Sequence, residues 1–272
     1  LTFLAVITKD LVYLALGFIS KFSSGYSEET IDPQRREFMQ KLLSIGIITT
    51  TGASTLKGLY NARKGPTIMK ENVPINNLHK DISGLKIAQI SDLHVGPTIK
   101  KGYVERVVSE VNDLNPDIIA ITGDMVDGSV NYLAPHVEPL KDLHANIGTF
   151  FVTGNHEYYS GVDQWLDKTD QLGFTNLLDS HEIIKKGDGE IILGGVTDYR
   201  SSTIKSSHKS DAKLAFDNAP ENTPKILLAH QPWSIYNAHE AGADLQLSGH
   251  THGGQFWPFV YPVRWANPYT AG

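Results

Sequence analysis

From about residue 85 onward, the chain repeats one pattern of hydrophobic and polar positions. Short apolar runs, rich in β-branched side chains, each end abruptly at polar residues. Such runs, bounded by turn residues, are typical of buried β-strands. The runs are LKIAQI (85–90), DIIAIT (117–122), GTFFVT (148–153), KILLA (225–229) and DLQLS (244–248).

Between several of these runs, apolar residues recur every three or four positions, which is the spacing of one face of an α-helix. This spacing predicts one helix around residues 104–114 and a second around residues 133–143. Strands that alternate with helices indicate parallel strands joined by crossover helices. Residues 181–197, with Gly187-Asp188-Gly189 at their centre, instead predict an antiparallel hairpin.

The first 65 residues have a different pattern and form a segment before the main domain of residues 66–272, with residues 61–75 as the link. Residues 11–19 are apolar, and Arg35 and Arg36 precede a weakly apolar stretch at residues 42–56. Paired arginines before an apolar stretch resemble a twin-arginine export signal or the positive flank of a membrane anchor. An amphipathic linker helix is the plainer alternative. We expect membrane association, with the main domain outside the cytoplasm.

Composition narrows the classes of function. The chain has 272 residues and a formal net charge of −6, without the basic face that nucleic-acid binding requires. It contains no cysteine, so disulfides and thiolate-bound metals are excluded. Any metal would be held by His, Asp, Glu or Asn. Both ends of the chain lie in apolar or aromatic stretches, from which we expect a partial sequence.

Ligand-type residues follow the apolar runs, at the carboxyl ends of the predicted strands. Sites in open α/β sheets form outside those ends, so we expect one site built from five loops. If the pair His250 and His252 is extended, both rings point the same way, toward one point or two neighbouring points. The candidate metal ligands are Asp92, His94, Asp124, Asn155, His230, His250 and His252.

Seven candidates are more than one ion needs, since one ion takes about four to six ligands. Two ions about 3.5–4 Å apart suit in-line phosphoryl displacement. Mixed ligation by His, Asp and Asn suits Mn, Fe, Zn or Co better than Ca or Mg. The set therefore predicts two divalent transition-metal ions and a phosphorylated small-molecule or lipid substrate.

In this order, D-x-H, GD-x-x-D, GNHE, a single H and GHTH resemble the motifs of the calcineurin-like metallophosphoesterase family. The resemblance covers residues 85–257, and SDLHVG…GDMVDG…GNHEYYSG…GHTHGGQ is similar to the membrane-associated bacterial branch. It implies an α/β fold of four layers, with a mixed two-sheet β-sandwich flanked by helices. The last strands of that fold would lie beyond this fragment. It also implies a place in the bacterial cell envelope.

The resemblance implies how the two ions would be held. One ion would be held by Asp92, His94 and His252, the other by Asn155, His230 and His250, with Asp124 as the bridge between them.

The resemblance also implies catalytic roles for two further residues. His156 would not be a ligand but would protonate the leaving oxygen or stabilise the transition state. Asp127 would accept a hydrogen bond from His156 and hold its ring. Gly128 follows Asp127 where the protein-phosphatase branch has arginine, which argues against a phosphoprotein phosphatase.

The sequence thus predicts a two-metal-dependent phosphohydrolase that cleaves phosphoester or pyrophosphate bonds through a metal-bridged hydroxide. An enzyme of the UDP-2,3-diacylglucosamine pyrophosphatase type is an alternative, although its substrate requires a site that faces the cytoplasm. A non-catalytic metal-binding scaffold is an alternative of another class, disfavoured because every ligand position is filled. A zinc hydrolase of the metallo-β-lactamase type is disfavoured because the H-x-H-x-D-H pattern is absent.

Overall fold

The computed structural model describes residues 6, 7, 9–11, 13–15, 18, 33–255 and 260–270. The chain divides into two compact units, Leu1–Gly65 and Pro66–Gly272. Parts of the apolar run at residues 11–19 lie outside the described residues, as do residues 256 and 257 at the end of the family resemblance.

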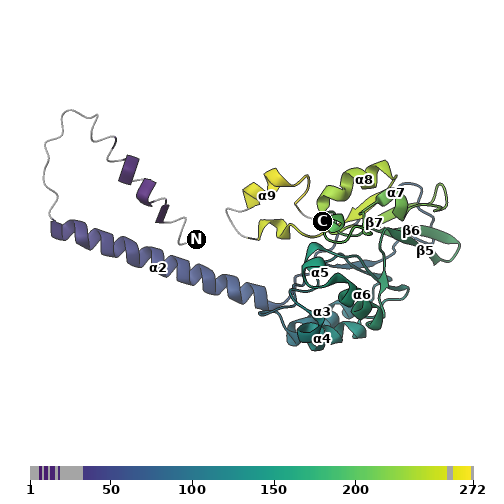
Figure 1. The fold of residues 1–272 in the computed structure, drawn as a ribbon, viewed down its shortest axis with the longest axis horizontal. Helices are drawn as coiled ribbons and strands as arrows, with labels where there is room; N and C mark the ends of the chain where they lie inside the picture. Colours follow the sequence, from purple (N-terminus) through teal and green to yellow (C-terminus); the bar gives the residue numbers. More distant parts are fainter. Residues whose placement is uncertain are drawn as a thin grey trace. The chain divides into compact units, whose positions relative to one another are not determined.

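The first unit contains one long helix, α2 (Pro33–Lys64), which includes the apolar stretch at residues 42–56 (Figure 1). Apolar side chains along it are exposed, among them Leu42 (54%) and Ile48 (68%). The helix continues to Lys64, so the predicted link at residue 61 begins later than its composition suggests. Across the described parts of the chain, we find no helix whose length and hydropathy would let it cross a bilayer.

The second unit is built on two four-stranded sheets. The first is parallel throughout and contains β1 (Ile87–Ile90), β2 (Ile118–Ile121), β3 (Gly148–Phe151) and β4 (Thr175–Asn176). In the second, an antiparallel pair is followed by parallel neighbours; it contains β5 (Ser180–Lys186), β6 (Gly189–Gly195), β7 (Lys225–Leu228) and β8 (Leu245–Leu247). The predicted hairpin and the predicted mixed two-sheet fold are confirmed.

Helices cover the outer faces of the two sheets. Figure 1 shows α3, α4 and α6 together on one side of this unit, and α7 and α8 on the other. The described helices are α3 (Lys101–Asp113), α4 (Val130–Val137), η1 (Glu138–Asp142), α5 (Asn155–Tyr159), α6 (Val162–Gln171), η2 (Ser201–Thr203), α7 (Ala212–Ala215), η3 (Pro232–Ser234), α8 (Ile235–Glu240), η4 (His252–Gly254) and α9 (Val260–Ala266).

The second predicted helix, at residues 133–143, is not continuous. The α-helix α4 ends at Val137, and the tighter 3-10 helix η1 follows it. Pro139 lies at the start of η1 and has no N–H with which to continue the α-helical ladder. The apolar spacing survives this change, since Val137 and Leu140 are both fully buried.

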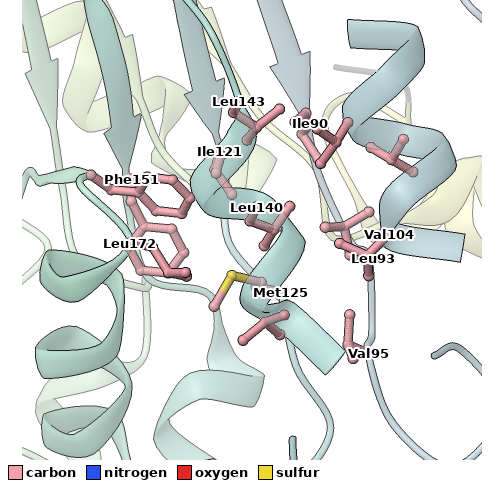
Figure 2. Close-up of a cluster of buried hydrophobic side chains, with 14 of the residues drawn as sticks. Ile90, Leu93, Val95, Val104, Ile121, Met125, Leu140, Leu143, Phe151 and Leu172 are labelled. Atoms are coloured by element: carbon pink, nitrogen blue, oxygen red, sulfur yellow. The ribbon is translucent and has the colours of Figure 1, made fainter. Parts of the chain in front are cut away.

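Three hydrophobic clusters separate four layers of structure. Ile119, Ile121 and Phe151 pack against the helices on the outside of the first sheet (Figure 2). Their alternate neighbours Ile118 and Phe150 pack between the two sheets. A third cluster joins the second sheet to α7 and α8. Both faces of β2, β3 and β7 are therefore largely buried, which explains why these strands read as continuous apolar runs.

The carboxyl ends of the two sheets lie next to each other. Gln89 in β1 donates from Nε2 to the backbone oxygen of Ser248, just after β8, at 2.9 Å. Gln89 Nε2 also donates to Thr122 Oγ1, just after β2, at 3.0 Å. Gln89 thus joins the loops that leave β2 and β8 to β1 through hydrogen bonds that involve no candidate ligand.

Candidate metal centre

The candidate side chains lie in the five loops that follow β1, β2, β3, β7 and β8. Much of this edge has unusual backbone geometry, because residues other than glycine rarely adopt a positive φ. Such conformations persist only where the surrounding structure holds them, and they concentrate at functional sites. The candidates with positive φ are Asp92 (55°), His94 (46°), Asp124 (51°), His250 (70°) and His252 (49°).

Two glycines allow these loops to approach closely. A Cβ on Gly249 would overlap the side-chain oxygens of Ser91 and Asp92. A Cβ on Gly154 would overlap Oδ1 of Asp124. Any larger residue at either position would push apart two loops that carry candidate ligands.

The three ligand-type side chains on the open side of the site are named here the outer group: Asp92, His94 and His252. His252 Nε2 lies 3.4 Å from Asp92 Oδ1 and 3.1 Å from His94 Nε2. The side chains of His94 and His252 are 20% and 29% exposed. One ligand atom from each residue lies within 4.8 Å of the others, close enough to share one ion.

A second set, the inner group, consists of Asp124, His230 and His250. His230 Nε2 lies 3.1 Å from Asp124 Oδ2 and 3.1 Å from His250 Nδ1. The side chains of His230 and Asp124 are 0% and 3% exposed. His230 Nδ1 lies 2.8 Å from the backbone oxygen of Thr122, which can only accept, so its Nε2 is the nitrogen free to bind an ion. These ligand atoms also lie within 4.8 Å of one another.

The pair His250 and His252 is not extended, so the extended geometry considered in the sequence analysis is wrong. Both have positive φ, and their rings belong to different groups. The second of the two predicted arrangements, two neighbouring points, is the one that the structure contains.

The carboxylate of Asp124 lies between the two groups. Its Oδ2 is 3.1 Å from His230 Nε2 and 3.8 Å from His94 Nε2. Burial works to raise the pKa of Asp124, but the hydrogen bond and charge of His230 outweigh it and lower that pKa to about 2. Burial likewise works to lower the pKa of His230, and the Asp124 carboxylate raises it to about 9. In the metal-free protein the two groups therefore form an ion pair.

Asp127 holds two histidine rings through one oxygen. His156 Nδ1 lies 2.6 Å from Asp127 Oδ1, which is the contact that the motif implied. His94 Nδ1 lies 2.8 Å from the same atom, and this second contact has no signal in the sequence. Because a carboxylate only accepts, each Nδ1 carries a hydrogen, and neither Nε2 is used in the contact with Asp127.

His156 also lies close enough to other ligand-type side chains to share an ion with them. Its Nε2 is 3.9 Å from Asp124 Oδ2, and its ring centroid is 4.6 Å from that of His94. Ligand atoms of His94, Asp124 and His156 lie within 4.8 Å of one another. The geometry thus permits His156 either as an acid beside the ions or as a ligand.

Two buried carboxylates at this edge were not identified from the sequence. Glu157, the last residue of GNHE, has no exposed surface and accepts hydrogen bonds from three backbone N–H groups. Asp198, after β6, is 1% exposed and accepts a hydrogen bond of 2.7 Å from Gln231 Nε2, beside His230. The spacing of Gly154 and Glu157 is that of a helix-capping pair, which could have indicated the first; Asp198 has no comparable signal.

The donor set fits divalent cations. Within the described residues, the ion pairs of Asp92, Asp124 and Asp127 come from histidines, and none comes from lysine or arginine. Asn155 Oδ1 is buried and has no hydrogen-bond partner in the described part of the chain. A buried amide oxygen without a donor is costly unless something positive faces it.

Comparison with known proteins gives one family. Residues 85–254 match the family model described as calcineurin-like phosphoesterase. The chain is 34% identical over 242 residues to the "Transmembrane protein with metallophosphoesterase domain" of Danio rerio, covering 86% of this chain and 55% of that protein. It is 36% identical over 257 residues to an uncharacterized metallophosphoesterase of Helicobacter pylori, covering 93% of this chain and 67% of that one. The chain therefore spans about half to two thirds of these relatives.

Among solved structures, similarity is found to a 5'-nucleotidase precursor from Thermus thermophilus. The sequence identity is 14% and the TM-score 0.46, over 62% of this chain and 42% of that chain. At this level of similarity, no substrate follows from the match.

Proposed function

This chain belongs to the calcineurin-like phosphoesterase family, and we propose that it is a two-metal-dependent phosphohydrolase that cleaves phosphoester or pyrophosphate bonds. The observation that carries the proposal is the position of Asp124. One carboxylate oxygen lies 3.1 Å from an inner histidine and 3.8 Å from an outer one. A carboxylate shared by two adjacent ligand groups is the arrangement that two-metal phosphoryl transfer requires.

The seven candidate ligands would divide between two sites. The outer group, Asp92, His94 and His252, would hold one ion. The inner histidines and the orphaned Asn155 Oδ1 would hold the other, with Asp124 shared. When bound, such ions supply Lewis-acid activation of water and of the phosphoryl oxygens. Nitrogen and oxygen ligands together suit Mn, Fe, Zn or Co.

The chain's own contribution to proton transfer would come from His156. Asp127 accepts from His156 Nδ1 and so fixes the ring, with Nε2 directed toward the side of Asp124. His156 is 36% exposed at its side chain, so a substrate can reach it. We assign His156 Nε2 the proton for the leaving oxygen, with Asp127 as the residue that orients it.

The two units of the chain would have different roles. We propose residues 1–65 as a membrane-associated segment and residues 66–272 as the catalytic domain. Exposed apolar side chains on α2 and its basic start at Arg35 support this, as does the name of the transmembrane relative from Danio rerio. The relatives include vertebrate and bacterial proteins, so they support the family and leave the bacterial branch, the cell envelope and the outward-facing domain as proposals.

The test is a metal analysis combined with a substrate screen. The purified protein, loaded in turn with Mn²⁺, Fe²⁺, Zn²⁺ and Co²⁺, should bind about two ions per chain. It should hydrolyse at least one of bis-p-nitrophenyl phosphate, p-nitrophenyl phosphate and a nucleotide-diphosphate lipid, and a chelator-treated sample should hydrolyse none. Two bound ions without hydrolysis of any ester or anhydride would favour the non-catalytic scaffold.

A further inference from the structure

Glu157 is a buried carboxyl group whose hydrogen-bond partners in the described residues are all backbone N–H groups. Its side chain has no exposed surface. Oε2 accepts from Gly154 N at 2.7 Å and Asp124 N at 3.0 Å, and Oε1 accepts from Met125 N at 2.8 Å. In the described residues no lysine or arginine forms an ion pair with it. Burying a carboxyl group is costly unless its oxygens are hydrogen-bonded, and here both oxygens accept from backbone N–H groups.

The three hydrogen bonds join the loop after β2 to the loop after β3. Two of them hold the N–H groups of Asp124 and Met125, on either side of the Asp124 Cα. Asp124 has a φ of 51°, a conformation that a residue with a Cβ keeps only when its surroundings fix it. The third holds Gly154, where the chain turns into α5 and delivers Asn155.

A reverse contact completes the link between the two loops. His156 N donates to Asp124 Oδ1 at 2.9 Å. The carboxylate of Asp124 is thus fixed through its own backbone by Glu157 and through its side chain by α5. A shift of either loop would move Asp124 relative to Asn155, and both belong to the proposed ion sites.

We propose that Glu157 is a positioning residue for both ions: it holds Asp124 and Asn155 at the spacing that two adjacent metal sites need. This inference rests on the proposed function, because it takes Asp124 and Asn155 as ligands. It assigns Glu157 no contact with an ion or a substrate.

The structure offers a matched control on the same strand. Asp117 precedes β2 as Asp124 follows it, and it is 8% exposed. Its carboxylate also accepts from a backbone N–H, that of Lys86, at 3.0 Å, from Asn146 Nδ2 at 3.1 Å and, unlike Glu157, from a lysine, Lys186 Nζ, at 3.1 Å. Asp117 therefore anchors the opposite end of β2 and touches no candidate ligand.

The experiment compares Glu157→Gln with Asp117→Asn in the full chain. Glutamine keeps the size of the side chain but places an NH₂ group against at least one backbone N–H. We expect both variants to melt at lower temperature than the wild type. Titration of the metal-free proteins with Mn²⁺ alone should show affinity lowered by about 10- to 100-fold in Glu157→Gln, as for other residues that orient ligands, and unchanged in Asp117→Asn.

Rescue by metal separates positioning from a general loss of structure. At saturating Mn²⁺ the Glu157→Gln protein should recover most of its kcat with KM unchanged, because every ligand is still present. Wild-type Mn²⁺ affinity in Glu157→Gln would overturn the proposal. If that variant does not fold, Glu157→Asp takes its place: it keeps the charge, but its shorter side chain cannot reach all three N–H groups, and wild-type affinity there would overturn the proposal equally.

Failure of the proposed function would have a different signature. A wild-type protein that binds Mn²⁺ but hydrolyses no phosphoester or anhydride would refute the phosphohydrolase assignment. The effect of Glu157→Gln on Mn²⁺ affinity would still be measurable in that protein and would decide the positioning role alone.

Discussion

The outer and inner groups use the same kinds of side chain in different environments. His94 and His252 of the outer group are 20% and 29% exposed, whereas His230 of the inner group is fully buried and held by the backbone of Thr122. His250 and His252 are two residues apart, yet they belong to different groups. The two groups therefore differ chiefly in burial, so an ion held by the outer group should exchange faster than one held by the inner group.

The largest effect is expected at Asp124, the residue that lies between the outer and inner groups. In Asp124→Asn one carboxylate charge is lost from both sites at once. We expect both ions to be lost and activity to fall further than the roughly 10²–10⁴-fold typical of a missing general acid. Elemental analysis and initial rates would measure this. A variant that keeps both ions and full turnover would show that Asp124 does not bridge.

The next largest effect should leave both ion sites intact. His156→Ala should keep two ions per chain and lower kcat by about 10²–10⁴-fold. The loss should be smaller for p-nitrophenyl phosphate than for an alkyl phosphate, since p-nitrophenolate leaves without a proton. Metal content and kcat on both substrates are the measurements. Loss of an ion would make His156 a ligand, and equal rate losses would remove it as the proton donor.

A paired substitution would sharpen the contrast between the two groups. His230→Ala should lose the inner ion and also reduce the free energy of unfolding by about 1–3 kcal/mol, because it leaves the Thr122 oxygen and Asp124 buried without their partner. His252→Ala should weaken the outer ion with little change in melting temperature, since its ring is partly exposed. Thermal melts of the metal-free variants would test this, and equal destabilisation would contradict the difference in burial.

The smallest effect is the pH dependence of the metal-free protein. The pKa of His230 is raised from 6.5 to about 9, so its contribution to stability is complete below pH 6.5 and is lost as the pH rises through 9. Glu157, whose pKa burial raises from 4.5 to about 7, adds a decline of the same sign at lower pH.

Melting temperatures between pH 4.5 and 9 would measure this decline. The portion above the pKa of Glu157, about 7, should be absent in His230→Ala, and absent from metal-loaded protein, where ions replace the proton on His230. A metal-free wild type whose stability does not change above pH 6.5 would contradict the raised pKa.

The strands and the ligand loops could be predicted from sequence because they are local patterns. Each apolar run ends at a ligand-type residue, and parallel strands bring those ends to one edge. The strand β4 could not be predicted, since it is only two residues long and is defined by its pairing with β3. The change from α4 to η1 was not predicted. It occurs at Pro139, but the apolar spacing continues through that residue and so gives no sign of it.

The features of the site that could not be predicted from the sequence depend on contacts between residues far apart in the chain. Besides local backbone contacts, Glu157 and Asp198 also accept hydrogen bonds from residues 32 or more positions away, and nothing in their local sequence identifies those distant partners. The directions of the His250 and His252 rings depend on positive φ angles, in a loop where Gly249 closely approaches Ser91 and Asp92.

The single oxygen of Asp127 that receives both His94 and His156 has a consequence for how variants are interpreted. Replacement of Asp127 would release two rings together: that of His94, proposed to bind an ion, and that of His156, proposed to donate a proton. Kinetic constants measured on such a variant would therefore mix two causes in one number. Metal binding and proton transfer can be measured separately only at side chains that serve one of the two roles. His252, proposed to bind an ion, and His156, proposed to donate a proton, are such positions.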